Sequence, residues 1–338
     1  MTIKDIARLS GYGVGTVSRV LNSHPDVSEK AREKVMAVVA EQNYRPNTNA
    51  KHLKQQTKSN ISILVKGTQN MLFADILEQI QALLREDRRE SAVYYLDEDA
   101  NEVSYAARLC KERRPQGVLF LGGDLGFFEK GFSEISVPCV LLTNSAKGLN
   151  FKNLSSLTTD DRAAAAHALD HLIEKGHRHI GVLGGNSSNS QISYRRFLGC
   201  QDSFSRHGLP FDPEGQCEPC RFSMADAYAA TGRLIERNPR LTAIFAMSDV
   251  MAIGAIRALC DRGLRVPEDI SIVGYDGIAS ARFSVPRLTT ILQDSRRLAK
   301  GGTEILLKNL ERTAGPIHEL VPFSLLSGES VAAPHTAL

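Results

Sequence analysis

Several features that define other protein classes are scarce or missing in these 338 residues. Six cysteines are too few for a disulfide framework in a chain of this length. No uncharged apolar run approaches the roughly 18–20 residues that a membrane-spanning helix needs. Residues 1–13 also lack the apolar stretch of a secretory signal. We therefore expect a reduced, cytoplasmic protein without a membrane partner.

Catalytic and metal-binding motifs are equally scarce. The sequence contains neither a G-x-S-x-G nucleophile elbow nor a G-x-x-x-x-G-K-[ST] phosphate loop. Cys217 and Cys220 form one C-x-x-C pair with no second pair at zinc spacing. His167 and His171 share a helical face without an evident third ligand. We therefore expect no enzyme activity, no metal and no cofactor, and a metal or redox role of the cysteine pair stays open as the alternative.

The net charge of +3 hides an uneven distribution of charged residues. Residues 1–58 contain ten Lys and Arg against five Asp and Glu, whereas the remainder contains 31 basic and 33 acidic residues. A small basic module before a mildly acidic body predicts that the module binds a polyanion. An ordinary solvated face is the alternative that charge alone leaves open.

The apolar pattern changes twice along the chain. Helices are predicted over 3–9, 14–21 and 28–43, and a polar linker follows over 46–60. From residue 61, apolar runs alternate with amphipathic helical stretches, which is the pattern of βαβ units with parallel strands. At roughly 100–200 residues per domain, this part predicts two α/β subdomains. The predicted strands are 61–65, 92–96, 117–121, 138–142, 179–183, 243–247 and 270–274, and the predicted helices are 73–88, 101–113, 161–175, 193–207, 225–237 and 249–262.

Residues 3–22, IKDIARLSGYGVGTVSRVLN, have the pattern of a helix-turn-helix. Ala7 supplies the small residue where two helices cross, and Gly11 tolerates a positive φ in the turn. The second helix of such a motif enters the major groove of DNA. An unrelated three-helix bundle is the alternative. The positions that lock the two helices together are apolar: Ile6, Tyr12, Val17 and Val20.

Five outward positions of the second helix are candidate DNA contacts: Val14, Gly15, Thr16, Ser18 and Arg19. Arg19 can donate two hydrogen bonds to guanine O6 and N7, and Thr16 and Ser18 suit phosphate contacts. Gly15 has no side chain with which to read a base. Direct reading at this face therefore depends on Val14 and Arg19.

Taken together, these stretches resemble the lactose-repressor (LacI/GalR) family of bacterial transcription regulators. The resemblance implies an all-α DNA-binding headpiece over 1–45, a hinge helix over 46–60, and an α/β core of the periplasmic-binding-protein fold with parallel sheets. Its N-subdomain would contain 61–159 and 292–323, and its C-subdomain 160–291 and 324–338. The matching segments run in order along nearly the whole chain: TIKDIARLSG, TVSRVLN, VSEKAREKVMAVVAEQNYRPN, DHLIEKGHRHIGVLGG, RRFLGC, FAMSDVMAIGAIRAL, LRVPEDISIVGYDG and PRLTTILQD.

The resemblance implies a homodimer or tetramer that binds palindromic double-stranded operator DNA. Leu53 would be the hinge residue inserted between base steps, with Ala50 beside it and Lys51 where arginine is common. A lone leucine in a polar segment agrees with such a wedge, because apolar wedges kink DNA from the minor groove. Docking of this leucine onto the core is the alternative. The remaining implied DNA contacts are Thr2, Asn22 and Asn47.

The resemblance also implies a small-molecule effector in a cleft between the subdomains. Arg196, in the R-x-x-G pattern with Gly199, and Asp276 would bind ligand hydroxyls, and Phe222 would stack on a sugar face. Other readings stay open: Asp249 could cap its helix, Asp276 could form a turn, and Arg196 could lie on the surface. The implied effector residues are Phe73, Arg196, Phe222, Ser248, Asp249, Asp276 and Gln293.

The sequence therefore predicts a transcription repressor whose operator affinity is set by a mono- or disaccharide in this cleft. A purine or sugar phosphate acting as corepressor is the alternative effector. A solute-binding protein would explain the core but not the helix-turn-helix. A cytosolic sugar-modifying enzyme would need a nucleophile or an acid–base pair, and none is evident.

Overall fold

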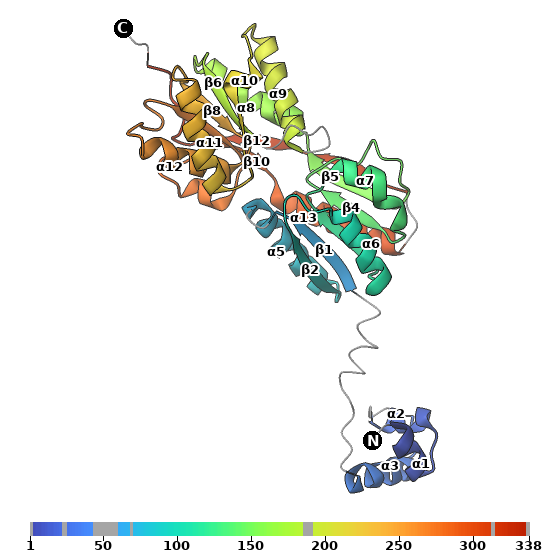
Figure 1. The fold of residues 1–338 in the computed structure, drawn as a ribbon. Coiled ribbons are helices and arrows are strands. Elements are labelled where there is room, and N and C mark those ends of the chain that lie inside the picture. The colour runs from blue at the N-terminus through green and yellow to red at the C-terminus, as the bar shows by residue number, and fades with distance from the viewer. Residues whose placement is uncertain are drawn as a thin grey trace. The chain divides into compact units, whose positions relative to one another are not determined.

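The computed structural model describes residues 3–21, 26–42, 60–67, 70–184, 192–311 and 315–335. The chain divides into two compact units, Met1–Lys58 and Ser59–Leu338, each of which is described by itself (Figure 1). In the parts of the chain described, no helix is long and apolar enough to cross a membrane.

The first unit contains three helices: α1 (Ile3–Ser10), α2 (Val14–Leu21) and α3 (Glu29–Glu41). Gly11 has a φ of +74° in the turn between α1 and α2, as the helix-turn-helix pattern predicts. Ile6 and Ser10 of α1 are buried, whereas Leu9 is 49% exposed. The small core contains Ile6, Ala7, Val17, Val20 and Val35, with Tyr12 partly buried against it.

The second unit contains two lobes, each built on a six-stranded sheet. The sheet of the first lobe has the order β2-β1-β3-β4-β5-β11, and its strands pair in parallel. Helices α5 and α13 cover one face, and α6 and α7 cover the other. The strands are β1 (Asn60–Lys66), β2 (Glu90–Leu96), β3 (Gly117–Leu121), β4 (Cys139–Leu142), β5 (Leu154–Thr159) and β11 (His318–Val321). The helices are α5 (Met71–Glu86), α6 (Glu102–Glu112), α7 (Leu125–Gly131), η1 (Phe132–Glu134) and α13 (Ser295–Glu311).

The sheet of the second lobe has the order β7-β6-β8-β9-β10-β12, and only β12 among its described strands runs antiparallel to its neighbour. Helix α8 packs with α9 and α11 packs with α12 (Figure 1). The strands are β6 (Ile180–Gly184), β7 (Cys217–Pro219), β8 (Ala243–Ala246), β9 (Ser271–Asp276), β10 (Thr289–Gln293) and β12 (Phe323–Leu326). The helices are α8 (Asp161–Glu174), α9 (Ile192–Arg206), α10 (Pro213–Gln216), α11 (Met224–Arg237), α12 (Asp249–Cys260) and η2 (Ala279–Arg282).

The chain passes between the lobes three times within the described residues: after β5, after β10 and after β11. Strand β10 stays in the second sheet up to Gln293, whereas the sequence placed the boundary at 291. Strand β12 joins the second sheet from Phe323, one residue before the expected boundary at 324. Backbone pairing, which the apolar pattern does not reveal, fixes these ends.

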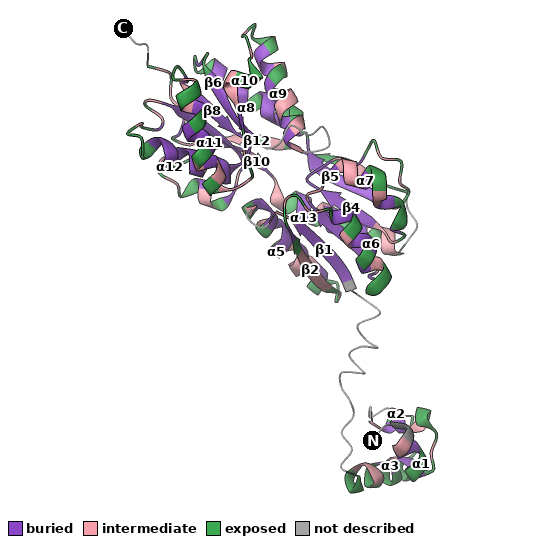
Figure 2. Ribbon diagram, viewed as in Figure 1, coloured by how far each residue is buried: buried purple, intermediate pink, exposed green. Residues whose placement is uncertain are grey.

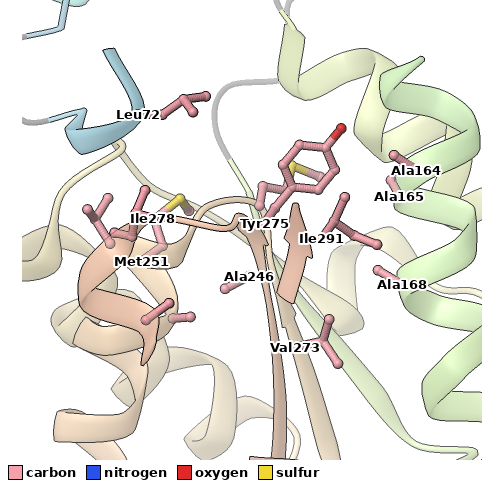
Figure 3. Packing of buried hydrophobic residues seen from close by; sticks show 14 of the residues in the cluster. Leu72, Ala164, Ala165, Ala168, Ala246, Met251, Val273, Tyr275, Ile278 and Ile291 are labelled. Carbon is pink, nitrogen blue, oxygen red and sulfur yellow. The ribbon is translucent and has the colours of Figure 1, made fainter. Parts of the chain in front are cut away.

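Burial explains why the predicted apolar runs form strands. Strands β3, β4, β6 and β8 are buried along their whole length, and the exposed residues of the lobes gather on the outer helices (Figure 2). Tyr275 of β9 lies beside Ile291 of β10, and Ala164 and Ala168 of α8 face this layer (Figure 3). The predicted mixed α/β fold with two parallel-sheet subdomains is therefore confirmed.

Candidate functional site: a cavity at the carboxyl ends of both sheets

A cavity of about 260 Å³ lies between the two lobes, where strands of both sheets end. Lys66 ends β1, Asp276 ends β9 and Gln293 ends β10, and all three side chains line the cavity. Open α/β sheets bind ligands in the crevice outside the carboxyl ends of their strands, where the connecting loops meet. The cavity therefore has the position of a ligand site in this architecture.

Arg196 is held in the cavity wall by a buried network. Its Nε donates to Asp161 Oδ1 at 2.8 Å, and its Nη1 donates to the carbonyl of Met247. Its guanidinium lies 3.7 Å from the ring centroid of Tyr275, whose hydroxyl also donates to Asp161 Oδ1 at 2.9 Å. Arg196 is therefore a fixed, charge-paired group, and the alternative that it lies on the surface is wrong.

Asp276 and Gln293 form the acceptor side of the cavity. Gln293 Nε2 donates to Asp276 Oδ1 at 2.8 Å, and Arg196 Nη2 lies 3.9 Å from the same oxygen. Burial raises the pKa of Asp276 to about 6, and the Arg196 charge and the Gln293 hydrogen bond oppose this rise. Gln293 Oε1 is buried and accepts no hydrogen bond from the residues described. A ligand donor would satisfy it, because buried polar atoms are normally paired.

The backbone is strained at two cavity residues. Asp276 has a φ of +117° and Thr143 a φ of +66°, a region that residues with a Cβ rarely adopt. Gly277 continues the left-handed conformation with a φ of +73°. Asp276 therefore forms the turn that was weighed from the sequence, and it also lines the cavity. Such strain gathers at ligand sites, where the fold holds a side chain in one orientation.

Ser248 and Asp249, which the sequence assigns to the effector site, do not line the cavity. Ser248 is the N-cap of α12, and its side chain accepts from the backbone N–H of Met251. The Asp249 carboxylate accepts from the N–H of Ile278 at 2.8 Å and from the hydroxyl of Thr290 at 2.5 Å. Asp249 therefore connects the segment after β9 to α12 and β10. It is not the N-cap of α12, and it does not line the cavity.

The first lobe contributes an ion pair that the sequence did not predict. Lys66 Nζ donates to Glu102 Oε2 at 2.6 Å and lies 4.8 Å from the ring centroid of Phe127. Glu102 Oε1 accepts from the N–H of Asp124 at 2.6 Å. Burial raises the pKa of Glu102, and the Lys66 charge opposes that rise. The pair fixes Lys66 and the start of α7 in the cavity wall.

Two aromatic residues line the cavity from opposite lobes, as the sequence predicts. Phe73 lies in the first turn of α5, and a Cβ added at Gly122 would come within 2.9 Å of its ring. Gly122 also has a φ of +77°, so both its backbone and its neighbour require glycine. Phe222 precedes α11, and its neighbour Arg221, which the sequence missed, forms ion pairs with the first lobe.

The face of α2 presents part of the predicted DNA-contact set. Val14 is 42% exposed, Gly15 and Arg19 are exposed, and Thr16 and Ser18 are half-buried. The carbonyl of Gly13 accepts from the N–H groups of Thr16 and Val17, so the chain enters α2 through a glycine cap. Six predicted contacts lie outside the described residues: Thr2, Asn22, Asn47, Ala50, Lys51 and Leu53.

The residues weighed as metal or redox groups occupy ordinary surroundings. Burial raises the pKa of the Cys217 and Cys220 thiols to about 12, which disfavours the reactive thiolate. His167 lies against the ring of Phe323, with centroids 6.0 Å apart. Across the described ranges, no three His, Cys, Asp or Glu side chains are placed to hold a metal ion.

Comparisons with known proteins agree along the whole chain. Residues 2–47 match the family described as "Bacterial regulatory proteins, lacI family", and residues 169–331 match a "Periplasmic binding protein-like domain". The regulator MalR of Clostridium butyricum is 35% identical over 98% of this chain and 99% of its own length.

Solved structures give the same result. A lac repressor dimer bound to operator and the anti-inducer ONPF is 27% identical, with a TM-score of 0.75 over 98% of this chain and 99% of its own. A complex of the transcriptional regulator CelR with cellobiose is 25% identical, with a TM-score of 0.71 over the same shares. The chain therefore belongs to the LacI family of bacterial regulatory proteins, which are DNA-binding transcription regulators and not enzymes.

Proposed function

We propose that this protein is a cytoplasmic repressor that binds a palindromic operator as a homodimer and is controlled by a neutral sugar in the cavity. The resemblance to a lac repressor dimer on its operator supports the dimer and the DNA partner. The CelR complex with cellobiose supports a sugar as the class of effector. The five predicted effector residues in the wall are Phe73, Arg196, Phe222, Asp276 and Gln293.

The charge pairing of the wall carries the choice of a neutral ligand. Each described cation of the wall already contacts a carboxylate of the protein: Arg196 contacts Asp161, Arg221 contacts Asp97, and Lys66 contacts Glu102. Five carboxylates also line the cavity. A phosphate would therefore meet no unpaired positive charge there and would face repulsion from these acids. The carboxylates that line the cavity are Asp97, Glu98, Asp124, Asp226 and Asp276.

Hydroxyl groups suit the acceptors and the aromatic rings of this wall. Asp276 and the unpartnered Gln293 Oε1 offer acceptors to ligand hydroxyls, and Phe73 and Phe222 offer apolar faces to a sugar ring. The volume of about 260 Å³ lies just below the roughly 300–1,000 Å³ of pockets for drug-sized ligands. The cavity therefore suits a mono- or disaccharide.

Control of DNA binding would follow from linkage between two sites. An effector that prefers one arrangement of the lobes changes operator affinity through the dimer, and the operator changes effector affinity by the same factor. Couplings of about 1–3 kcal/mol are typical and correspond to about 5–150-fold in affinity.

A thermal-shift screen of the full chain tests the choice of effector. The panel contains neutral mono- and disaccharides, including ribose and cellobiose, together with sugar phosphates and purines. At least one neutral sugar should raise the melting temperature, because a ligand that binds the folded state stabilises it. Stabilisation by a sugar phosphate or purine alone would contradict the neutral-sugar assignment.

Operator selection tests the repressor function. The full chain is incubated with random duplex DNA, and the enriched sequences are measured by fluorescence anisotropy at several salt concentrations. We expect a palindromic consensus whose affinity falls steeply with salt and changes when the sugar from the screen is added. Enrichment of no sequence, with or without the sugar, would contradict the proposal.

A further inference from the structure

Arg221 links the two lobes at the rim of the cavity. It follows β7 of the second lobe, whereas Asp97, Glu98 and Asp99 follow β2 of the first lobe, and we call these three residues the acidic loop. Arg221 Nη2 lies 2.7 Å from Asp97 Oδ1 and 3.7 Å from Asp99 Oδ2, and Arg221 Nε lies 3.5 Å from Glu98 Oε2. One guanidinium therefore meets three carboxylates of the opposite lobe.

The same contact reaches the aromatic residue beside it. The backbone N–H of Phe222 donates to Glu98 Oε2 at 3.4 Å, so one carboxylate of the first lobe contacts two consecutive residues of the second. Phe222 lines the cavity together with Arg221, Asp97 and Glu98. The backbone that carries the Phe222 ring is therefore tied to the lobe opposite its own.

We propose that Arg221 and the acidic loop form a latch that holds the lobes closed and positions Phe222 over the cavity. The inference rests on the proposed function only in taking the cavity as the effector site. Arg221 acts as a positioning residue, because its guanidinium engages protein carboxylates and it is Phe222 that would meet the ligand. Ligand access then requires these ion pairs to separate.

The ion pairs of the latch are largely exposed to solvent, so they can separate. The Arg221 side chain is 49% exposed, and the Asp97 and Asp99 side chains are 65% and 73% exposed. Salt weakens such contacts, since the Debye length falls from about 30 Å at 0.01 M to about 3 Å at 1 M ionic strength. Glu98 is the most buried member, with a side chain 27% exposed, and burial raises its pKa while the Phe222 N–H and Arg221 oppose the rise. Because three carboxylates surround one guanidinium, salt should weaken several contacts of the cluster at once.

The lack of tryptophan in this chain allows a direct test without any ligand. Phe222→Trp places a single indole at the latch, and acrylamide quenching of its fluorescence reports how far the cavity is open. The parent F222W is compared with F222W/R221Q and with the control F222W/R257Q. Arg257 is a suitable control because it is exposed and pairs with Asp261 at the C-terminal end of its own helix, and neither residue lines the cavity.

The expected pattern depends on both salt and Arg221. In F222W the quenching constant should rise about twofold between about 0.05 M and 1 M NaCl as the ion pairs are screened. F222W/R221Q should show the high value at both concentrations, and F222W/R257Q should behave like F222W. Equal quenching in all three proteins would overturn the latch. A change in F222W/R221Q without any salt dependence in F222W would overturn its ionic basis.

Hydrogen exchange of the full chain without the reporter gives an independent measurement. Peptides covering residues 96–101 and 220–224 should exchange faster in R221Q than in the unaltered protein, and peptides of α12 should not change. Unchanged exchange in both peptides of R221Q would overturn the proposal. Because neither experiment contains a ligand, failure of the latch is distinguishable from failure of the sugar screen.

Discussion

Asp276 joins a strained backbone to a buried carboxyl whose pKa is raised to about 6, so the effector binding proposed here should be sensitive to pH. A ligand hydroxyl that donates a hydrogen bond to the Asp276 carboxylate favours its ionised form. Ligand binding therefore releases the proton when Asp276 is protonated. Affinity should therefore hold above pH 7 and fall about tenfold for each pH unit below 6. Calorimetric titration with the sugar from the screen, between pH 5 and pH 8, measures this. Asp276→Asn should bind more weakly with a flat pH profile, and an unchanged profile would exclude Asp276 as the titrating group.

Gly199, which the sequence pairs with Arg196, has a packing role of its own. A Cβ at this position would lie 2.2 Å from the carbonyl oxygen of Arg162, where α9 crosses α8. Gly199→Ala should therefore lower the free energy of unfolding by about 1–3 kcal/mol, because two helix backbones must separate. Urea denaturation measures the change. Gly148→Ala is the matched control, since a Cβ there meets nothing within 4 Å. Equal urea midpoints for Gly199→Ala and Gly148→Ala would contradict this packing role, because α8 and α9 would then accommodate the added Cβ without cost.

Sequence patterns indicate residues near the ends of predicted elements. They do not indicate residues whose role depends on a partner far away in the sequence. Asp276 follows the predicted apolar strand 270–274, so its place near a strand end could be predicted from the pattern. The places of Arg196, inside α9, and of Gln293, at the end of β10, were implied only by the resemblance to the family. Lys66 pairs with a residue 36 positions away, and Arg221 with one 124 positions away. Nothing local to either residue indicates its partner, because the Lys66 partner is set by packing within the first lobe and the Arg221 partner by how the lobes meet.

Two glycines, one before helix α2 and one inside it, have opposite expected effects on its stability. A Cβ at Gly13 or Gly15 meets nothing within 4 Å. Gly15 lies inside the helix, so Gly15→Ala should stabilise it by roughly 0.5–1 kcal/mol. Gly13 caps the helix, where alanine is worse than glycine, so Gly13→Ala should destabilise it by a similar, roughly 0.5–1 kcal/mol amount. Amide exchange of residues 14–21 in the full chain checks both signs, and a shift in the same direction for both variants would refute the capping role of Gly13.

Strand β5 shows what limits the prediction of elements. Its sequence LSSLTT has no continuous apolar run and was not predicted as a strand, yet it is buried throughout. Ser155 Oγ accepts from the N–H of Ile317, and Ser156 Oγ accepts from the N–H of Ala146 while bonding His318 Nδ1. The hydroxyls of these two serines are satisfied by residues up to 162 positions away, so their burial in this strand depends on tertiary contacts. Apolar strands such as β3 and β8 need no such partners and could be predicted.

At the scale of the whole molecule, the two compact units predict separable functions. The headpiece has its own core, separate from the two buried clusters of the lobes. A chain lacking residues 1–58 should therefore fold, keep its thermal shift with the sugar from the screen, and lose operator binding in fluorescence anisotropy. Operator affinity that survives this deletion would refute the assignment of DNA binding to the helix-turn-helix.

The short link between β11 and β12 has a consequence for how such proteins can be recombined. Only Pro322 separates two strands that belong to different sheets, and α13 returns to the first lobe after β10 has completed most of the second. Neither lobe is thus encoded by an uninterrupted stretch of the gene, and no single exchange of coding sequence can replace one without the other. The first unit, Met1–Lys58, is one uninterrupted stretch and can be exchanged in one piece. A single crossover at this boundary should therefore join one DNA-binding unit to a complete second unit, whereas replacing one lobe alone would need several crossovers.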